Sequence, residues 1–298
     1  MEPRERRGVS CESDDPVALS ESQRLGHASF LARISNPRSA VACTGTFRGF
    51  TVSAPKIGSV PDMGERPHVL VTGAAGAIGS VVIARLGDRW QLRPTDLRPS
   101  AGVDPLDVVD PDSCRAAFAG MDAVVHLAAN PDQEAGWSEL RHPNVDGLYA
   151  VAAAARDCGV RRLVLASSLH AVSALPETVQ RRSSDPPRPA NLYGATKAWA
   201  EALGAWVAAT SSTSVVALRI GYFSANPPAG QEATPRNLAA WLSPADCVDL
   251  IRAAVESDVT GLTVVNGVSA NRYRIAEHGE AERRLGYRPT DDAWEHLP

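Results

Sequence analysis

The stretch Val69-Leu-Val-Thr-Gly73-Ala-Ala-Gly76-Ala-Ile-Gly79 decides the fold of this chain. Its apolar start predicts a buried strand, and the residues after the glycines predict a helix. Gly73 would permit a tight turn between the two, and Gly79 would let the helix pack closely against the strand. Gly76 would let the phosphates of a ligand approach the backbone at the helix N-terminus. The stretch therefore predicts a phosphate-binding loop at the end of a strand.

Strand-like and helical runs alternate along the rest of residues 65–298. Such alternation predicts an α/β fold of the Rossmann type, a doubly wound parallel sheet with helices on both faces. We expect a small C-terminal substrate-binding lobe, built mainly from residues 222–243 and 266–298. The expected strands are 68–72, 91–95, 123–127, 162–166, 215–219 and 261–265, and the expected helices are 78–87, 111–119, 144–158, 191–210, 244–256 and about 276–285.

Residues 1–64 differ in character from the rest of the chain. Glycine, proline, serine and charged residues are scattered through them, and no helical or strand period persists. We expect a disordered N-terminal extension or a misassigned start. Met63, five residues before the first expected strand and one of only three methionines, would then be the natural first residue.

Composition excludes several classes of function. The net charge of −4 gives no reason to expect nucleic acid or an anionic membrane as a partner. No apolar run approaches the roughly 20 residues that span a bilayer. The five cysteines are odd in number and widely spaced, which indicates free thiols in a reducing compartment rather than disulfides or a metal site. We therefore expect a cytoplasmic protein that holds no metal.

An acidic residue closes the second expected strand. Asp96 lies where a carboxylate would bind the ribose hydroxyls of a dinucleotide that the glycine loop holds by its phosphates. A carboxylate there repels the 2′-phosphate of NADP, so NAD is the expected cofactor. Arg98, two residues further on, is able to bind that phosphate, and some use of NADP stays open.

Tyr193 and Lys197 lie four residues apart at the start of a long expected helix, and so on one face of it. An ammonium group held near a tyrosine stabilises the phenolate and lowers the tyrosine pKa toward neutrality, which would make Tyr193 a usable base. Only two of the 30 basic residues are lysines, and Lys197 is the only one after Met63. A site that needs a compact ammonium would not accept the planar guanidinium of arginine.

These motifs together resemble the extended short-chain dehydrogenase/reductase family, also called the NAD-dependent epimerase/dehydratase family. The resemblance runs from about Pro67 to Pro289 and rests on Thr72-Gly-x-x-Gly-x-x-Gly and Tyr193-x-x-x-Lys197. It implies catalysis by Ser168, Tyr193 and Lys197. It also implies that Asp107 contacts the adenine. Helix capping would explain Asn144 equally well. The implied cofactor-binding residues are Gly73, Ala75, Gly76, Ala77, Ile78, Gly79, Asp96, Asp107, Leu127, Ala128, Ala129, Asn144, Tyr193 and Lys197.

The later half of the chain resembles uronate dehydrogenases in the segments 166–170, 192–197, 218–221, 235–244 and 265–271. The resemblance implies that Arg236 clamps the carboxylate of a sugar acid, a pairing that guanidinium groups suit well. Ser168 would bind substrate. His170 is able to bind a substrate hydroxyl as well, although a structural hydrogen bond would explain this histidine equally well. The implied reaction oxidises the C1 hydroxyl of a uronate to an aldarolactone.

The chain departs from the uronate dehydrogenase pattern at three places. Leu169 stands where the family usually has Asn, Pro131 lies in a loop where Ser or Thr is expected, and Tyr222 replaces a smaller residue. Each change removes a polar contact or fills space. A different sugar or polyol acid therefore stays open as the substrate.

Two functions of other classes stay open beside the dehydrogenase. One is a sugar or nucleotide-sugar epimerase that keeps NAD tightly bound. The other is a non-catalytic NAD(H)-binding regulator, although regulators usually lose the tyrosine that this chain keeps as Tyr193. For each, the expected partners are a small molecule and, as in many relatives, further copies of the chain in a homodimer or a higher homo-oligomer.

Overall fold

The computed structural model describes residues 66–296. The expected N-terminal extension and Met63 lie outside the described residues. Within them, no helix is long and apolar enough to cross a membrane. The same part of the chain contains no group of three or more His, Cys, Asp or Glu side chains that could hold a metal ion.

Seven strands form one sheet in the order β3-β2-β1-β4-β5-β6-β9, and every neighbouring pair is parallel. This order confirms the predicted Rossmann-type fold. Six of the seven strands were expected from the sequence, and β3 is too short to produce a pattern. The strands are β1 (His68–Thr72), β2 (Gln91–Asp96), β3 (Asp104–Pro105), β4 (Ala123–His126), β5 (Arg162–Ser168), β6 (Ser214–Ile220) and β9 (Leu262–Gly267).

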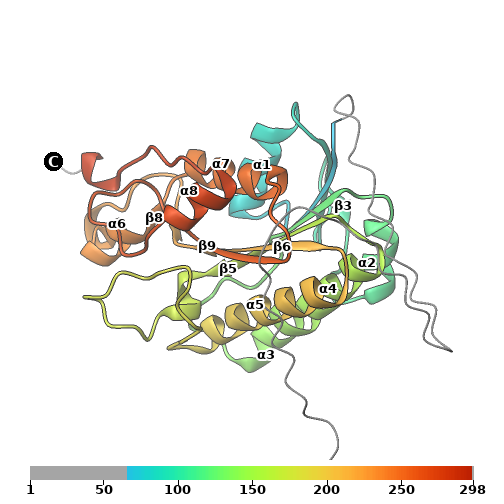
Figure 1. Ribbon diagram of the computed structural model, residues 1–298, viewed down its shortest axis with the longest axis horizontal. Helices are drawn as coiled ribbons and strands as arrows, with labels where there is room; N and C mark the ends of the chain where they lie inside the picture. Colours follow the sequence, from blue (N-terminus) through green and yellow to red (C-terminus); the bar gives the residue numbers. More distant parts are fainter. Residues whose placement is uncertain (1–65, 297–298) are drawn as a thin grey trace, which may run out of the picture. The chain divides into compact units, whose positions relative to one another are not determined.

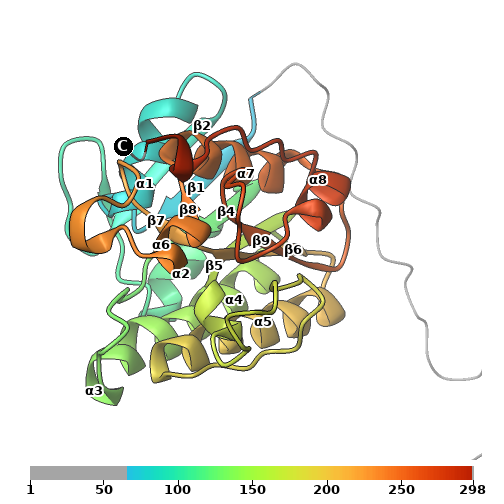
Figure 2. The ribbon, with the colours of Figure 1, turned by 90° about the vertical axis from the view of Figure 1, so that its left-hand side faces the viewer.

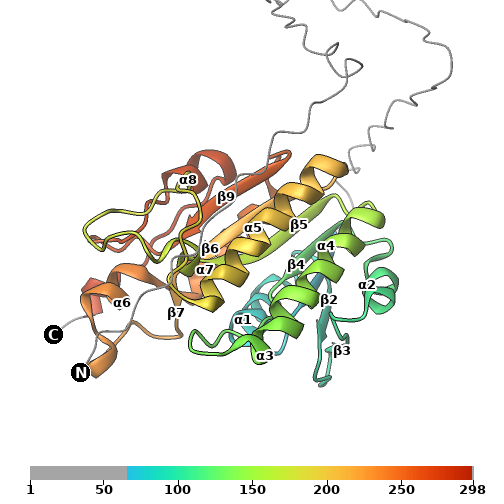
Figure 3. The same cartoon turned by 90° about the horizontal axis from the view of Figure 1, so that it is seen from below.

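Helices cover both faces of the sheet (Figure 1). On one face α7 packs against α1 and α8, and on the other α4 packs against α2 and α5. Figure 3 shows α4 and α5 side by side in front of the strands. The helices are α1 (Ala77–Leu86), α2 (Pro111–Phe118), α4 (Gly147–Asp157), α5 (Leu192–Thr210), α7 (Pro244–Glu256) and α8 (Gly279–Leu285).

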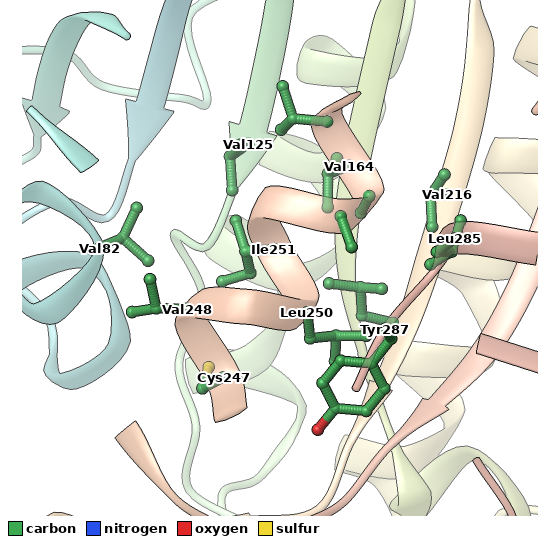
Figure 4. Close-up of a cluster of buried hydrophobic side chains, with 14 of the residues drawn as sticks. Val82, Val125, Val164, Val216, Cys247, Val248, Leu250, Ile251, Leu285 and Tyr287 are labelled. Carbon is green, nitrogen blue, oxygen red and sulfur yellow. The ribbon is translucent and has the colours of Figure 1, made fainter. Parts of the chain in front are cut away.

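The hydrophobic core consists of two layers, because successive strand residues point to opposite faces of the sheet. In β1, Val69 and Val71 belong to the layer under α7, whereas Leu70 belongs to the layer under α4 and α5. In Figure 4, Leu250 and Ile251 of α7 lie among the valines of β4, β5 and β6. Strands buried on both faces explain the continuous apolar runs in the sequence.

The helix expected over residues 144–158 differs from the prediction at its start. A short helix α3 (Trp137–Leu140) is followed by a π-helical turn over Arg141–Asp146, and α4 begins only at Gly147. Pro143 lies inside this turn and has no N–H to donate to the preceding turn. The wider π-helical turn fits this missing donor, since such turns occur where a regular helix is interrupted.

Two chain segments lie beyond the carboxyl ends of the strands. One is the excursion, defined as residues 173–190 between β5 and α5. The other contains β7 (Tyr222–Phe223), α6 (Pro235–Ala240) and β8 (Trp241–Leu242), in which β7 pairs with β8. Figures 1 and 2 show both beyond the same end of the sheet, where open α/β folds bind their ligands.

Candidate active site

The glycine loop between β1 and α1 is as tight as the sequence predicts. Gly73 adopts a φ of +69°, and a Cβ atom there would lie 2.6 Å from the backbone nitrogen of Ala128. A Cβ on Gly79 would overlap the carbonyl oxygen of Gly73. Neither position tolerates a side chain, so the loop lies directly against the residues that follow β4, and the start of α1 lies directly against the loop.

The N-terminus of α1 is open to a ligand. Gly76 is the N-cap residue and has no side chain to accept from the first N–H groups of the helix. Ala75, Gly76 and Ala77 are exposed. Free N–H groups and the positive end of the helix dipole bind phosphate oxygens. The loop therefore fits the pyrophosphate of a dinucleotide.

Asp96 anchors this loop. One carboxylate oxygen accepts a hydrogen bond from the Ala75 backbone N–H at 3.0 Å, and the other accepts from the Arg98 N–H at 3.1 Å. Its place at the end of β2, beside the glycine loop, is the one that a ribose-binding acid requires. Asp107 is exposed just after β3, and its carboxylate accepts from the Val109 N–H at 3.0 Å.

The loop after β4 is held to β1 by a threonine. The Thr72 hydroxyl oxygen accepts from the N–H groups of Leu127 and Ala128, each at 3.3 Å. It also lies 2.8 Å from the His126 ring nitrogen Nδ1. Leu127, Ala128 and Ala129 consequently lie beside Gly73, on the border of the predicted cofactor site.

Asn144 is buried within the π-helical turn and does not cap a helix, so the capping interpretation is wrong. Its Oδ1 accepts from the Asn130 N–H at 2.7 Å, and its Nδ2 donates to the Asn130 carbonyl at 3.0 Å. The same Nδ2 donates to the Thr196 hydroxyl at 3.2 Å. Asn144 thus ties the loop after β4 to α5.

The three predicted catalytic residues converge. Ser168 ends β5, and Tyr193 lies in the first turn of α5, where a hydrogen bond joins its hydroxyl to that of Ser168. A Cβ on Gly194 would overlap the carbonyl oxygen of His170. Only glycine therefore allows the start of α5 to approach the end of β5 closely enough to bring the two hydroxyls together.

Lys197 lies one helical turn behind Tyr193. Its Nζ donates to the Ala166 carbonyl at 3.0 Å and lies 5.4 Å from the centre of the Tyr193 ring. Burial lowers the pKa of Lys197 to about 8. The sequence predicted a lowered pKa for Tyr193, and this prediction is wrong for the structure as it stands. Burial raises the pKa of Tyr193, and the hydrogen bond to Ser168 opposes the rise only in part.

His170 lies edge-on to Tyr193, with 5.6 Å between ring centres. Burial, and then the charge of Arg236, lower the pKa of His170, so the ring is neutral at pH 7. Its Nδ1 lies 3.2 Å from Asn191 Nδ2, which carries protons only. With Nδ1 accepting, the proton of His170 is on Nε2, and the ring acts as a hydrogen-bond donor through that atom.

A cavity of about 850 Å³ joins these groups. Ser168, Tyr193, His170 and Arg236 all line it. Ala77 and Ile78 line it as well, which makes it continuous with the glycine loop. A nicotinamide reaching from that loop and a sugar against Arg236 would therefore share one space.

Arg236 lies in the first turn of α6, and about half of its side chain is exposed. Its Nη1 lies 3.3 Å from the Glu177 carboxylate. The three departures from the uronate dehydrogenase pattern, Leu169, Pro131 and Tyr222, all line the same cavity. The wall of this cavity is thus partly apolar.

The sequence did not point to several residues that line the cavity. Gln133 and Glu134 come from the loop after β4, and Ser173, Arg181 and Ala190 from the excursion. Segments without helical or strand periodicity carry no signal that assigns such side chains to a site. Asn191 is an exception that a capping signal could have revealed, because it is the N-cap of α5.

Comparisons with known proteins agree with this geometry. Residues 69–260 match the family model described as the NAD dependent epimerase/dehydratase family. The chain is 38% identical over 247 residues to an L-arabinose 1-dehydrogenase (NAD(P)(+)) of Haloferax volcanii, across 76% of this chain and 97% of the relative. It is 34% identical over 233 residues to a uronate dehydrogenase of Agrobacterium fabrum, across 76% and 85%. The crystal structure of a mutant uronate dehydrogenase from Agrobacterium tumefaciens complexed with NAD matches at a TM-score of 0.70 and 33% identity, across 78% and 87%.

Proposed function

Since this chain belongs to the NAD-dependent epimerase/dehydratase family, we propose that it oxidises the C1 hydroxyl of a uronic acid to an aldarolactone. The observation that carries the proposal is the position of Arg236, which lines the same cavity as Ser168 and Tyr193. A guanidinium there would bind the sugar carboxylate by a charge-assisted pair and direct the opposite side of the ring toward the catalytic hydroxyls.

In the proposed reaction, the hydroxyl oxygens of Ser168 and Tyr193 orient the substrate hydroxyl at C1. Tyr193 takes the proton from that hydroxyl as hydride leaves C1. Lys197, buried behind the tyrosine ring, stabilises the phenolate form that accepts the proton. The Nε2–H of His170 donates to a substrate oxygen. NAD, when bound, supplies the hydride acceptor.

The residues proposed to hold NAD follow from the fold. The glycine loop and the open N-terminus of α1 bind the pyrophosphate, and Asp96 binds the adenine ribose. The Asp96 carboxylate disfavours a 2′-phosphate at the same place. Asp107 contacts the adenine. Ala128, Asn144 and their neighbours form the border against which the nicotinamide half lies.

A neutral aldose is the second candidate substrate. Leu169, next to Ser168, lines the cavity with an apolar side chain, and Glu177 already faces Arg236. Both features weaken the case for a carboxylate. The relative from Haloferax volcanii is named for L-arabinose, a neutral sugar.

A substrate panel distinguishes these functions. We expect galacturonate or glucuronate with NAD to raise absorbance at 340 nm, and NADP to support less activity. If the enzyme oxidises arabinose or galactose in preference to the uronates, a neutral aldose becomes the proposed substrate. If NAD copurifies with the protein and no sugar raises the absorbance, the result would instead indicate an epimerase. If the protein binds NAD but neither oxidises nor epimerises any sugar, the result would indicate a regulator.

We further propose that the enzyme works in the cytoplasm. The cysteines within the described residues, Cys114, Cys158 and Cys247, are free thiols. Free thiols persist in a reducing compartment. If treatment with an oxidising extract leaves both the activity and the number of titratable thiols unchanged, the free thiols do not indicate a reducing compartment.

A further inference from the structure

A buried ion pair lies directly behind the active site. Arg219 of β6 and Glu201 of α5 are both buried, with 2% and 6% of their surfaces exposed. Two hydrogen bonds join them, Nε to Oε1 at 2.8 Å and Nη2 to Oε2 at 2.9 Å. This two-point geometry fixes the plane of the guanidinium as well as its distance from the acid.

On one side the pair is joined to the catalytic residues. The Ser167 hydroxyl donates to Glu201 Oε1 at 2.8 Å, and Ser167 directly precedes Ser168 in β5. Glu201 lies one helical turn after Lys197 in α5. The acid therefore connects the strand that carries the catalytic serine with the helix that carries the catalytic lysine.

On the other side the pair is joined to the excursion, residues 173–190. Arg219 Nη1 donates to the Arg182 carbonyl at 3.2 Å, and Nη2 donates to the Asp185 carbonyl at 2.9 Å. The excursion contributes Ser173, Arg181 and Ala190 to the cavity wall. One guanidinium thus holds both the catalytic framework and a wall of the substrate cavity.

Stability alone is a weak explanation for such a pair. Desolvation of two charges often cancels their attraction, and apolar residues of similar volume often serve as well. A planar group with five fixed donors offers something that apolar packing lacks, because it sets the direction of each contact. Here the guanidinium of Arg219 contacts Glu201, which is joined to the catalytic residues, and the backbone of the excursion, which forms a wall of the cavity.

We propose that Arg219 and Glu201 are positioning residues, which fix the excursion against Ser168 and Lys197 and thereby set the affinity for the sugar. The kinetic part of this inference rests on the proposed dehydrogenase function. Neither residue lines the cavity, so both act through the residues that they hold.

Arg162 provides a matched control. It is also buried, with 1% of its surface exposed, and it also donates to two backbone carbonyls, those of Ser257 and Val259. It begins β5, whereas Ser168 ends that strand, so Arg162 lies at the opposite end of the strand from the cavity. A purely structural role of Arg219 would leave KM for the sugar unchanged on substitution, as expected for Arg162.

The test compares Arg219→Lys with Arg162→Lys in the full chain. Lysine keeps the charge but cannot reach Glu201 and both carbonyls together. We expect Arg219→Lys to raise KM for the sugar by about tenfold with NAD affinity changed by less than about twofold, while Arg162→Lys leaves both unchanged. Backbone amides of residues 173–190 should exchange hydrogen faster only in Arg219→Lys.

Equal changes in the two variants, or unchanged KM and unchanged exchange in Arg219→Lys, would overturn the inference. If Arg219→Lys does not fold, Glu201→Gln provides the same comparison, since it removes the charge while keeping the side-chain shape. Hydrogen exchange needs no turnover. A wild-type protein that oxidises no sugar would therefore remove the proposed function and still leave the positioning role to be decided by exchange.

Discussion

The two sides of the cavity are built in different ways. The cofactor side consists of strand ends and helix starts, and its polar groups, such as Thr72, Ser168 and Lys197, are buried and bonded to the backbone or to each other. The wall on the sugar side consists of the excursion and α6. Its charged group Glu177 is largely exposed and Arg236 is about half exposed, and their contact with each other is a surface ion pair. In the proposed function, the groups held by the sheet would carry out the chemistry, whereas the loops would select the sugar.

Tyr193→Phe is the most direct test of the cofactor side. Removing the hydroxyl removes the proposed proton acceptor but leaves the glycine loop intact, so we expect turnover to fall by about a thousandfold or more. NAD affinity, measured by calorimetry, should change little. Turnover within about tenfold of wild type would show that another group takes the proton.

Sequence motifs predicted the tight glycine loop and the placement of Tyr193 beside Lys197, because each motif is local, while the binding of a cofactor by these residues stays a prediction. The requirement for Gly73 and Gly79 arises within a few residues, and so does the spacing of Tyr193 and Lys197. The capping interpretation of Asn144 was wrong because Pro143 alters the helix from within, whereas the role of Asn144 in cofactor binding stays a prediction. The direction of the Tyr193 pKa was also wrong, because it depends on burial by the whole fold.

The sequence placed α6 within the expected substrate-binding lobe, but it did not point to the part of the sugar-side wall that the excursion forms, because the contacts of the excursion join distant parts of the chain. Arg181 pairs in a β-bridge with Ala276, far along the sequence, and its guanidinium donates to the Leu175 and Val179 carbonyls. No periodicity marks such a residue. Arg236 was found only through the resemblance to uronate dehydrogenases.

Lys197→Met tests by how much the buried charge of Lys197, which the proposed catalysis needs, lowers the free energy of unfolding. Burial lowers the pKa of Lys197 from 10.5 to about 8, which corresponds to roughly 3 kcal/mol against the charged form in the folded state. Methionine avoids this cost but loses the hydrogen bond to Ala166, worth roughly 1 kcal/mol. We therefore expect the variant to be inactive and about 2 kcal/mol more stable at pH 7, measured by urea unfolding.

The pH dependence of this gain has a definite sign. Between pH 8 and 10.5 the unfolded chain keeps the lysine proton that the folded chain has lost, so wild-type stability rises with pH in that window. The advantage of Lys197→Met should accordingly be complete below pH 8 and shrink as pH rises toward 10.5. Lys197→Arg, which stays charged, should show no gain. A gain independent of pH would assign the effect to packing instead.

Arg236→Ala tests the sugar-side wall and has the smallest expected effect. A charge-assisted hydrogen bond contributes roughly 1.5–3 kcal/mol. Arg236 belongs at the lower end of this range, because it is partly exposed and contacts Glu177. We therefore expect KM for a uronate to rise about tenfold. KM for arabinose should stay unchanged, as should kcat for both sugars.

The control is Arg188→Ala, because Arg188 is an exposed arginine of the excursion that does not line the cavity. It removes the same charge from the same wall and should leave both sugars unaffected. An equal loss for uronate and arabinose in Arg236→Ala would mean that the arginine shapes the wall without binding a carboxylate. The sugar side would then select its substrate by shape. It would differ from the cofactor side in rigidity and not in the use of charge.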